Sequence, residues 1–289
     1  MFLKSAPSVG ESFRACEEIA FRHYENFPVA SIFIPREKRK YVAAIYAFAR
    51  TADDFADEEG YTAGTRMEKL TELERKLHDS ANASVRDPLF IALGETIRRF
   101  DLPVECFENL LRAFRMDNEK KRYGNWIELL QYCLYSANPV GRLILRLFGY
   151  SGDEYTRASD AICTALQLTN FWQDLSIDVR RNRIYIPLED LENFGCTQED
   201  ILKGRTHDNF KRLMGHEVAK TVALFDEGKT LTKLVGRDLQ FQLKLTWLAG
   251  MKILKKIRRT NYDVFQQRPT ISFWDKVSLV MGAWLGRVS

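Results

Sequence analysis

The sequence predicts an all-α protein. Apolar residues recur with helical periodicity along almost all of the 289 residues. Glycines such as Gly60 and Gly124 fall where turns between helices are expected. Strand-like sequence is scarce, and its best example, residues 184–186, ends at Pro187. Since no repeat, low-complexity linker or other boundary divides the chain, we expect one helical domain over residues 1–289, folded around a central apolar cavity.

The expected helices follow one another with short connections. Thr65 with Glu68 and Ser151 with Glu154 have the spacing of capping boxes, which predicts helix starts at both places. Pro103 suits the first turn of the helix after it. The other boundaries follow from the apolar periodicity. The predicted ranges are 11–25, 37–58, 65–79, 86–100, 104–116, 126–148, 153–180, 207–235, 238–260 and 273–286.

Composition excludes several classes of partner and site. The net charge of +4, from 43 basic and 39 acidic residues, is too small to indicate nucleic-acid binding. The five cysteines form no CxxC pair, which argues against a disulfide framework and against zinc. The four histidines form no metal-binding cluster. With no secretory signal recognised, we expect a cytoplasmic protein.

The C-terminal stretch from Phe273 to Val288 is the longest apolar segment. Asp275 and Lys276 interrupt it, and no uninterrupted apolar run reaches the roughly 18 residues of a membrane span. The segment could lie on a membrane surface, which would make the protein peripheral to the inner membrane. We favour a helix docked on the protein core, and keep the membrane surface as the alternative.

A first acidic motif lies in the segment that ends Arg50-Thr-Ala-Asp53-Asp54-Phe-Ala-Asp57. Asp53 and Asp57 are four residues apart and share one side of a helix, which Arg50 joins. Two such acids usually mark a solvated surface. Residues 41–56, however, are apolar nearly all round, as in a buried helix. Removing carboxylates from water costs free energy in such a helix unless they face a cation or a water-filled cavity.

A second motif has the same character. Asn170, Asp174 and Asp178 recur every four residues and form an oxygen-rich stripe over two helical turns. Arg180, Arg181 and Arg183 follow, and a guanidinium can hold a phosphate with two hydrogen bonds. Arg183, beside the apolar residues 184–186, is the best candidate. At least one of the other two is expected to be an ordinary exposed charge.

Together the two stripes indicate a divalent-metal site. They offer only hard oxygen ligands, which suit Mg²⁺ completed by substrate phosphates. Two acidic helices facing each other across a cavity could hold several ions bridged by a diphosphate, whose departure the ions would assist. Aromatic residues near the motifs, including Phe171 and Trp172, could stabilise a carbocation, but we expect most of them in the core.

The motifs resemble those of the squalene/phytoene synthase family. The residues up to Asp57 are similar to its first aspartate-rich motif, and residues 170–185 to its second. Tyr132-Cys-Leu-Tyr-Ser-Ala-Asn-Pro-Val-Gly141 resembles the tyrosine-bearing segment between them, and Asn261-Tyr262 a C-terminal pair near the diphosphate. The resemblance runs from about residue 23 to residue 262, with the motifs in the right order.

The resemblance implies the isoprenoid synthase fold and a role for each matching residue. Tyr132 would lie near the reacting carbons, and Asp54, turned about 100° from Asp53, has a weaker role. The residues assigned to catalysis are Tyr132, Gln173, Asp53, Asp57, Asp174 and Asp178. Mg²⁺–diphosphate would be bound by Asp53, Asp57, Asn170, Asp174 and Asp178, and the rest of the substrate site formed by Asn26, Arg50, Asn138, Arg183, Tyr185 and Tyr262.

Three departures from the family pattern suggest a particular reaction. The serine-rich segment is replaced by His23-Tyr-Glu-Asn26-Phe-Pro28, the usual Ala-Gly by Asn138-Pro139, and an arginine before the aspartate by Gln173. These changes resemble hydroxysqualene synthase of the bacterial hopanoid route. An enzyme that ionises only one diphosphate could dispense with the serines and the arginine. Gln173 or Asn138 could position a water, although a structural polar contact is an equal alternative for Gln173.

The expected reaction is therefore Mg²⁺-dependent ionisation of presqualene diphosphate, rearrangement of the cation and capture by water. We expect no NADPH, although the absence of a Gly-x-Gly-x-x-Gly motif does not exclude it. The nearest alternative is a head-to-head prenyl transferase that makes presqualene diphosphate, squalene or phytoene. A non-catalytic helical lipid-binding subunit and a helical phosphohydrolase are more distant alternatives. Other enzymes of the pathway are candidate partners.

Overall fold

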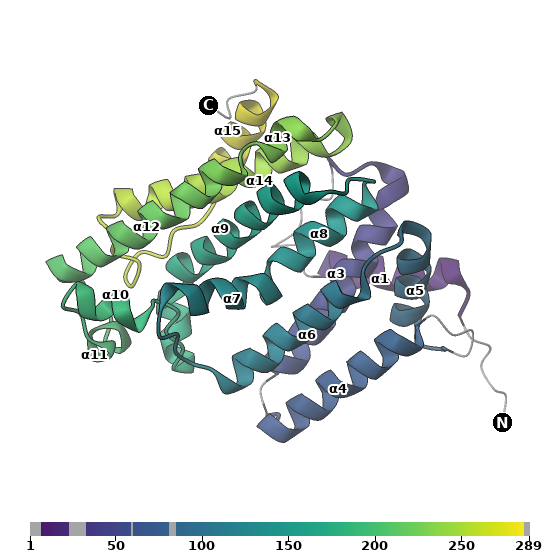
Figure 1. Ribbon diagram of the computed structural model, residues 1–289, viewed down its shortest axis with the longest axis horizontal. Helices are drawn as coiled ribbons and strands as arrows, with labels where there is room; N and C mark the ends of the chain where they lie inside the picture. The colour runs from purple at the N-terminus through teal and green to yellow at the C-terminus, as the bar shows by residue number, and fades with distance from the viewer. Residues whose placement is uncertain (1–6, 23–32, 59, 81–84, 286–289) are drawn as a thin grey trace. The chain divides into compact units, whose positions relative to one another are not determined.

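Every regular element in the part of the chain that the structure describes is a helix (Figure 1). The computed structural model describes residues 7–22, 33–58, 60–80 and 85–285. The expected all-α class is confirmed. The strand-like segment 184–186 is not a strand: Ile184 forms only an isolated parallel bridge with Arg122. A ladder would need a longer extended neighbour to continue the pairing.

Contacts divide the chain into two units, residues 1–118 with 142–151 and residues 119–141 with 152–289. The division passes through α8 (Asn138–Leu147), whose first turn belongs to the second unit. The expectations of one domain over residues 1–289 and of a central apolar cavity stay predictions.

The first unit is built around α3 (Arg36–Asp57). Helices α1 (Val9–Arg22), α4 (Ala63–Asp79) and α5 (Pro88–Phe100) pack against it, and α6 (Val104–Glu119) completes the unit. Phe48 of α3 is fully buried and meets Phe90 and Phe107 edge-on, with ring centroids 6.3 and 5.3 Å away. Because Phe48 holds one face in the core, Arg50, Asp53 and Asp57 lie on the opposite face, roughly 140–200° around the helix.

The second unit is built around α9 (Asp153–Asp178). Helices α7 (Trp126–Ser136), α12 (Asp208–Gly228) and α14 (Arg237–Arg259) pack against it, and Figure 1 shows α12, α9 and α14 running side by side. Trp172 of α9 is fully buried and donates its indole N–H to Thr221 of α12 at 2.8 Å. Trp172 is thus a core residue that aligns α9 with α12 and turns the acidic stripe away from the core.

Short helices connect these long ones. They are the 3₁₀ helix η1 (Val179–Arg181) and the helices α10 (Leu188–Asn193), α11 (Gln198–Leu202) and α13 (Leu231–Leu234). Helices α10 and α11 were not predicted, because helices of six and five residues are too short for a periodic apolar pattern.

Some predicted boundaries are wrong for identifiable reasons. The helix predicted over 126–148 is two helices that meet at Ala137. Pro139 has no N–H to donate to the carbonyl four residues earlier, and its ring crowds that carbonyl, so the helix cannot continue through this point. Thr62, not Thr65, caps α4, and its side chain accepts the Thr65 N–H. Gly152, not Ser151, stands at the start of α9.

The C-terminal helix α15 (Phe273–Trp284) packs on α14, as expected for a helix docked on the core. Its buried residues are Asp275, Leu279 and Ala283. Within the described ranges, no helix combines the length and the apolar character needed to cross a membrane.

Candidate active site

The first acidic motif is a charged cluster on the last turns of α3. Arg50 contacts Asp53 one turn later, with Nη1 3.2 Å from Oδ2, and contacts Asp54 with Nη2 2.6 Å from Oδ1. Asp54 therefore lies within reach of the same guanidinium as Asp53. These side chains are half-buried, and Ala52 and Ala56 beside them are buried. The carboxylates thus follow a stretch of α3, residues 41–48, in which every residue but Tyr46 is buried.

The electrostatics of this cluster favour a cation. Burial raises the pKa of Asp53; Arg50 opposes this shift, and the nearby carboxylates of Asp57, Asp54 and Asp117 add to it. Asp53 thus lies near three other carboxylates, and a divalent cation would relieve the repulsion between them. Asp117, near the end of α6, was missed by the sequence analysis because nothing in its local sequence connects it with α3.

The second motif lies along the last turns of α9. Asn170 is exposed, and Asp174 and Asp178 are half-exposed, so the predicted stripe does project from one side of the helix. Arg268 donates from Nε to Oδ1 of Asp174 at 2.7 Å. Arg268 was also missed: it is 94 residues away in sequence, and only the return of the chain after α14 brings it here.

Gln173 contacts the same returning segment. Its side-chain amide donates to the carbonyl oxygen of Pro269 at 2.6 Å. This bond agrees with the structural alternative for Gln173, and it also fixes the direction of the other amide atom, Oε1. A role in positioning water stays a prediction.

The chain reverses directly after α9. Asn182 has a φ of 55°, in the left-handed region, and the Arg183 N–H donates to the Asp178 carbonyl at 2.9 Å. Arg122 steadies the turn by donating to the Asn182 side chain at 2.7 Å. As a result Arg183 is buried with 8% of its surface exposed, whereas Arg180 and Arg181 are exposed. The preference for Arg183 over its neighbours agrees with this placement.

Four aromatic rings form a cluster beside this turn. Tyr185 stacks on Phe171 with centroids 3.6 Å apart and an interplanar angle of 8°. Tyr132 lies 5.8 Å from Phe171 and 5.9 Å from Tyr185, and Tyr123 lies 5.6 Å from Tyr132. All four are buried. The structure thus brings together Tyr132 and Tyr185, which were predicted separately, and adds Tyr123.

The first turn of α8 is held on α9. Asn138 is buried and accepts a hydrogen bond from the Thr164 hydroxyl at 2.9 Å. Gly141 allows the close approach, because a Cβ there would lie 2.3 Å from Ser159 Oγ and 2.6 Å from Cys163 Sγ. The Asn-Pro-Val-Gly segment therefore has a packing role, whatever else Asn138 does.

The Asn261-Tyr262 pair ends α14. Both residues have positive φ values, 52° and 62°, which non-glycine residues seldom adopt. The Tyr262 N–H donates to the Ile257 carbonyl at 2.9 Å, and its ring packs near Gly215 of α12. This strained turn starts the return segment that carries Arg268 and Pro269 to the second motif.

The predicted site residues fall into two sets. Arg50, Asp53 and Asp57 are gathered in the first unit. The second unit carries Tyr132, Asn138, Asn170, Gln173, Asp174, Asp178, Arg183, Tyr185 and Tyr262. Asn26 lies outside the described residues. The meeting of the two sets across one cavity stays a prediction.

Comparison with known proteins identifies the family. The sequence profile described as squalene/phytoene synthase matches residues 21–275. The chain belongs to the squalene/phytoene synthase family. Its members are synthases that process isoprenoid diphosphates, so this chain is such an enzyme with the isoprenoid synthase fold.

Individual relatives of this synthase carry several names. The crystal structure of squalene synthase HpnC from Alicyclobacillus acidocaldarius has 44% sequence identity and a TM-score of 0.84, covering 88% of this chain and 95% of that one. A dehydrosqualene synthase in complex with ligand has 26% identity and a TM-score of 0.85, covering 96% and 97%. A 15-cis-phytoene synthase from Synechocystis sp. is 29% identical over 98% of this chain and 87% of its own length.

The donor atoms of this synthase fit a divalent metal. Each motif presents carboxylate oxygens, with an amide oxygen added by Asn170, and these are the ligands that Mg²⁺ prefers. A guanidinium already neutralises acids in each motif, Arg50 for Asp53 and Arg268 for Asp174. Within the described ranges, no group of three or more acidic, histidine or cysteine side chains lies together as a complete metal site.

Proposed function

We propose that this synthase converts presqualene diphosphate and water into hydroxysqualene, diphosphate and a proton. The carbon–oxygen bond to the diphosphate breaks, and the leaving group takes the electron pair. The cyclopropylcarbinyl cation opens and rearranges. Water then forms the new carbon–oxygen bond and releases a proton. No reductant enters this stoichiometry, so NADPH is not required.

The observation that carries the proposal is the neutral side chain before Asp174. A condensing enzyme has to hold two diphosphates, for which a cation at this position is useful. Gln173 supplies none, and its amide is already engaged with the Pro269 carbonyl. The neighbouring Arg268 brings one guanidinium to Asp174, which suits a single leaving group. The 44% identity to squalene synthase HpnC is consistent with a substrate of this class.

The charged residues would hold and release the diphosphate. Asp53, Asp57, Asn170, Asp174 and Asp178 are proposed to bind Mg²⁺, which when bound neutralises the charge that develops on the leaving group. Arg50 and Arg183 would contact phosphate oxygens, and the buried position of Arg183 strengthens such a contact. Tyr262 and Asn26 belong to the same proposed substrate site.

The aromatic cluster would bind the hydrocarbon part of the substrate, where the cation forms. Phe171, Tyr132 and Tyr185 are buried and closely packed, so they exclude water. A ring face outside the Phe171–Tyr185 stack would stabilise the cation through its negative quadrupole. Capture of the cation by water then requires a side-chain oxygen that accepts a hydrogen bond from the attacking water. Gln173 is suited to this role because its N–H is directed at Pro269, and its Oε1 can orient a water. Asn138 is the alternative, with its Oδ1 engaged by Thr164.

A head-to-head prenyl transferase is the second candidate. Relatives named phytoene synthase, including the Synechocystis protein at 29% identity, favour it. This activity would use the same metal ligands and the same phosphate-binding arginines. The two candidates differ in the number of diphosphates that enter the site and in the source of the product oxygen.

The test offers the purified enzyme farnesyl diphosphate and presqualene diphosphate separately, with Mg²⁺ and with or without NADPH. We expect hydroxysqualene from presqualene diphosphate alone, with oxygen from labelled water in the product by mass spectrometry. Rapid coupling of farnesyl diphosphate would refute the proposal in favour of the second candidate. Unchanged hydroxysqualene yield from a Gln173→Leu enzyme would refute the role of Gln173 only.

The proposed location is the cytoplasm, at the face of the inner membrane. All five cysteines are free thiols, which is consistent with a reducing compartment. A long apolar substrate would favour an enzyme close to the membrane, alongside other enzymes of the pathway.

A further inference from the structure

Helix α15 exposes large apolar side chains on the face that does not pack on α14. Among the described residues, Phe273, Trp274, Met281, Trp284 and Leu285 have 70%, 78%, 58%, 79% and 51% of their surface exposed. The buried residues Asp275, Leu279 and Ala283 lie on the opposite side of the helix. In the described part of its unit, α15 thus packs through one side, and its opposite side is apolar and exposed.

This exposure is concentrated rather than scattered. Single apolar residues on a surface are normal, whereas an apolar patch usually marks an interaction site. Two tryptophans and a phenylalanine make this patch aromatic. Such side chains suit the boundary between water and the bilayer interior, because their rings are apolar while the indole N–H can still meet water.

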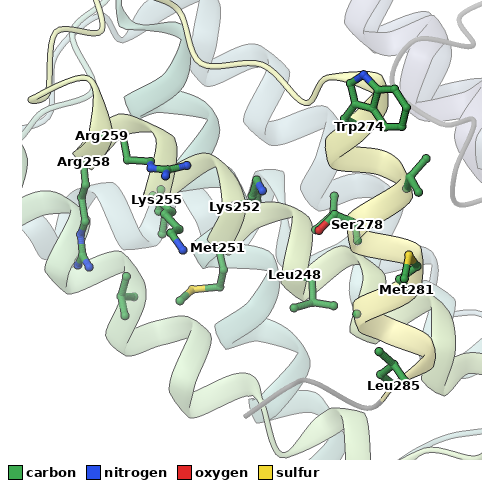
Figure 2. Close-up of a pocket in the computed structure, with 15 residues that line it drawn as sticks. Leu248, Met251, Lys252, Lys255, Arg258, Arg259, Trp274, Ser278, Met281 and Leu285 are labelled. Atoms are coloured by element: carbon green, nitrogen blue, oxygen red, sulfur yellow. The ribbon is translucent and has the colours of Figure 1, made fainter.

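A groove of about 860 Å³ continues the patch onto α14. Figure 2 shows Leu248 and Met251 of α14 on one side, and Ser278 and Met281 of α15, with Leu285 directly after this helix, on the other. An apolar strip therefore runs along both helices.

The end of this groove is cationic. Lys255, Arg258 and Arg259 line it on the last turns of α14 and are exposed (Figure 2). From Leu239 to Thr260 the chain has six basic residues and no acidic one. The single acid of α15, Asp275, is held by Lys252 at 3.1 Å and by Lys256. The surface beside the apolar strip is therefore positively charged.

We propose that α15 and the C-terminal half of α14 form a docking surface for an anionic lipid bilayer. The exposed apolar patch of α15 would enter the boundary between the lipid headgroups and the acyl chains. Lys255, Arg258 and Arg259 would contact the lipid phosphates. Cations at a helix C-terminus also offset the helix dipole, so the charge alone would not indicate a partner. Their position beside an exposed aromatic arc does, because anionic lipid complements both features at once.

A second copy of the chain fits this surface less well. Symmetric dimers bring the same patch of both subunits together, so the cations of one would face those of the other. An anionic bilayer meets no such repulsion. The proposal does not depend on which isoprenoid diphosphate the enzyme uses.

The test measures binding of the full chain to sedimenting vesicles of phosphatidylcholine with roughly 30% phosphatidylglycerol. We expect binding that weakens with salt and is much weaker on pure phosphatidylcholine. The double variant Lys255→Gln/Arg258→Gln should bind roughly 30-fold more weakly. A charge-matched control is Lys233→Gln/Arg237→Gln, since Arg237 lies about 27 Å away from Lys255 along α14 and should leave binding unchanged.

A second pair of variants tests the apolar patch. Trp274→Ser/Trp284→Ser should weaken binding at least tenfold, whereas Ile127→Ser, which changes a side chain that is 78% exposed on α7, should not. Circular dichroism should show all four proteins folded, because the changed side chains are exposed. Absence of vesicle binding, equal binding of variants and controls, or self-association lost in the variants without lipid binding would each overturn the proposal.

Discussion

Helix α12 contains a buried carboxyl group whose ionisation should set the pH dependence of stability. Glu217 has no exposed surface. Lys220 Nζ lies 3.4 Å from Glu217 and 2.8 Å from Asp190, and it also sits 3.7 Å from the centre of the Trp126 ring. Burial and a hydrogen bond with Asp190 raise the pKa of Glu217 from 4.5 to about 8. Glu217 is therefore protonated in the folded enzyme at neutral pH.

The sign of the effect follows from this raised pKa. In the unfolded chain Glu217 ionises near its ordinary pKa of 4.5, so the folded state binds the proton more tightly. Its contribution to stability is complete below that value and is lost as the pH rises through about 8. Between about pH 5.5 and about pH 8 the loss amounts to about 3 kcal/mol.

Asp190 does not cancel this loss. Burial opposes its ionisation, but hydrogen bonds from Glu217 and Lys220 lower the pKa of Asp190 below its ordinary value of 3.8. A lowered carboxyl pKa contributes stability that is lost only as the pH falls, below this window. His216, 3.8 Å from Asp190, is present in both wild type and a Glu217 variant, so the difference between the two proteins over this pH range reports Glu217.

The assay is urea unfolding of wild type and Glu217→Gln across this pH range, followed by circular dichroism. The amide keeps the shape and cannot ionise, so the stability of the variant relative to wild type should increase with pH by about 3 kcal/mol. Glu227→Gln, at an exposed position of the same helix, is the matched control and should follow wild type. Parallel pH profiles for wild type and Glu217→Gln would refute the assignment of a protonated Glu217.

Three further predictions concern the candidate site. Asp53→Asn should lower the turnover rate at least 100-fold, in steady-state assays, by removing charge from the first motif. Arg268→Gln should cost less than about 1 kcal/mol of stability, because its ion pair with Asp174 is part-exposed. It should also change the Mg²⁺ concentration needed for half-maximal release of diphosphate. Gly141→Ala should destabilise the fold by about 1–3 kcal/mol in urea unfolding, because its Cβ would meet Ser159 and Cys163.

Each of these has its own control. Asp208→Asn, at an exposed acid of α12, should keep full turnover. A similar loss of turnover in this variant would contradict a specific catalytic role for Asp53. For Arg268, an unchanged Mg²⁺ dependence would show that its contact with Asp174 has no bearing on the metal site. Gly10→Ala, where a Cβ would meet nothing within 4 Å, is the control for Gly141.

The local pattern of the sequence was enough for the class of fold and for the metal-ligand candidates. Helical periodicity depends on neighbouring residues only, and the long helices α3, α9 and α14 were predicted to within about two residues at each end. The spacing of Asp53 and Asp57, and of Asn170, Asp174 and Asp178, is likewise local. The same reasoning preferred Arg183 to its neighbours because apolar residues follow it directly, and the structure buries Arg183.

Contacts between distant residues were decided by the tertiary structure alone. Arg268 reaches Asp174, Asp117 approaches Asp53, and Tyr123 joins Tyr132 because packing brings together helices and turns that the sequence separates. The protonation of Glu217 is also a result of packing, which determines the access of its carboxyl group to water. Periodicity shows which face of a helix is apolar. It does not show which helix covers that face, because the hydrophobic effect is non-directional and favours any partner that buries the apolar surface.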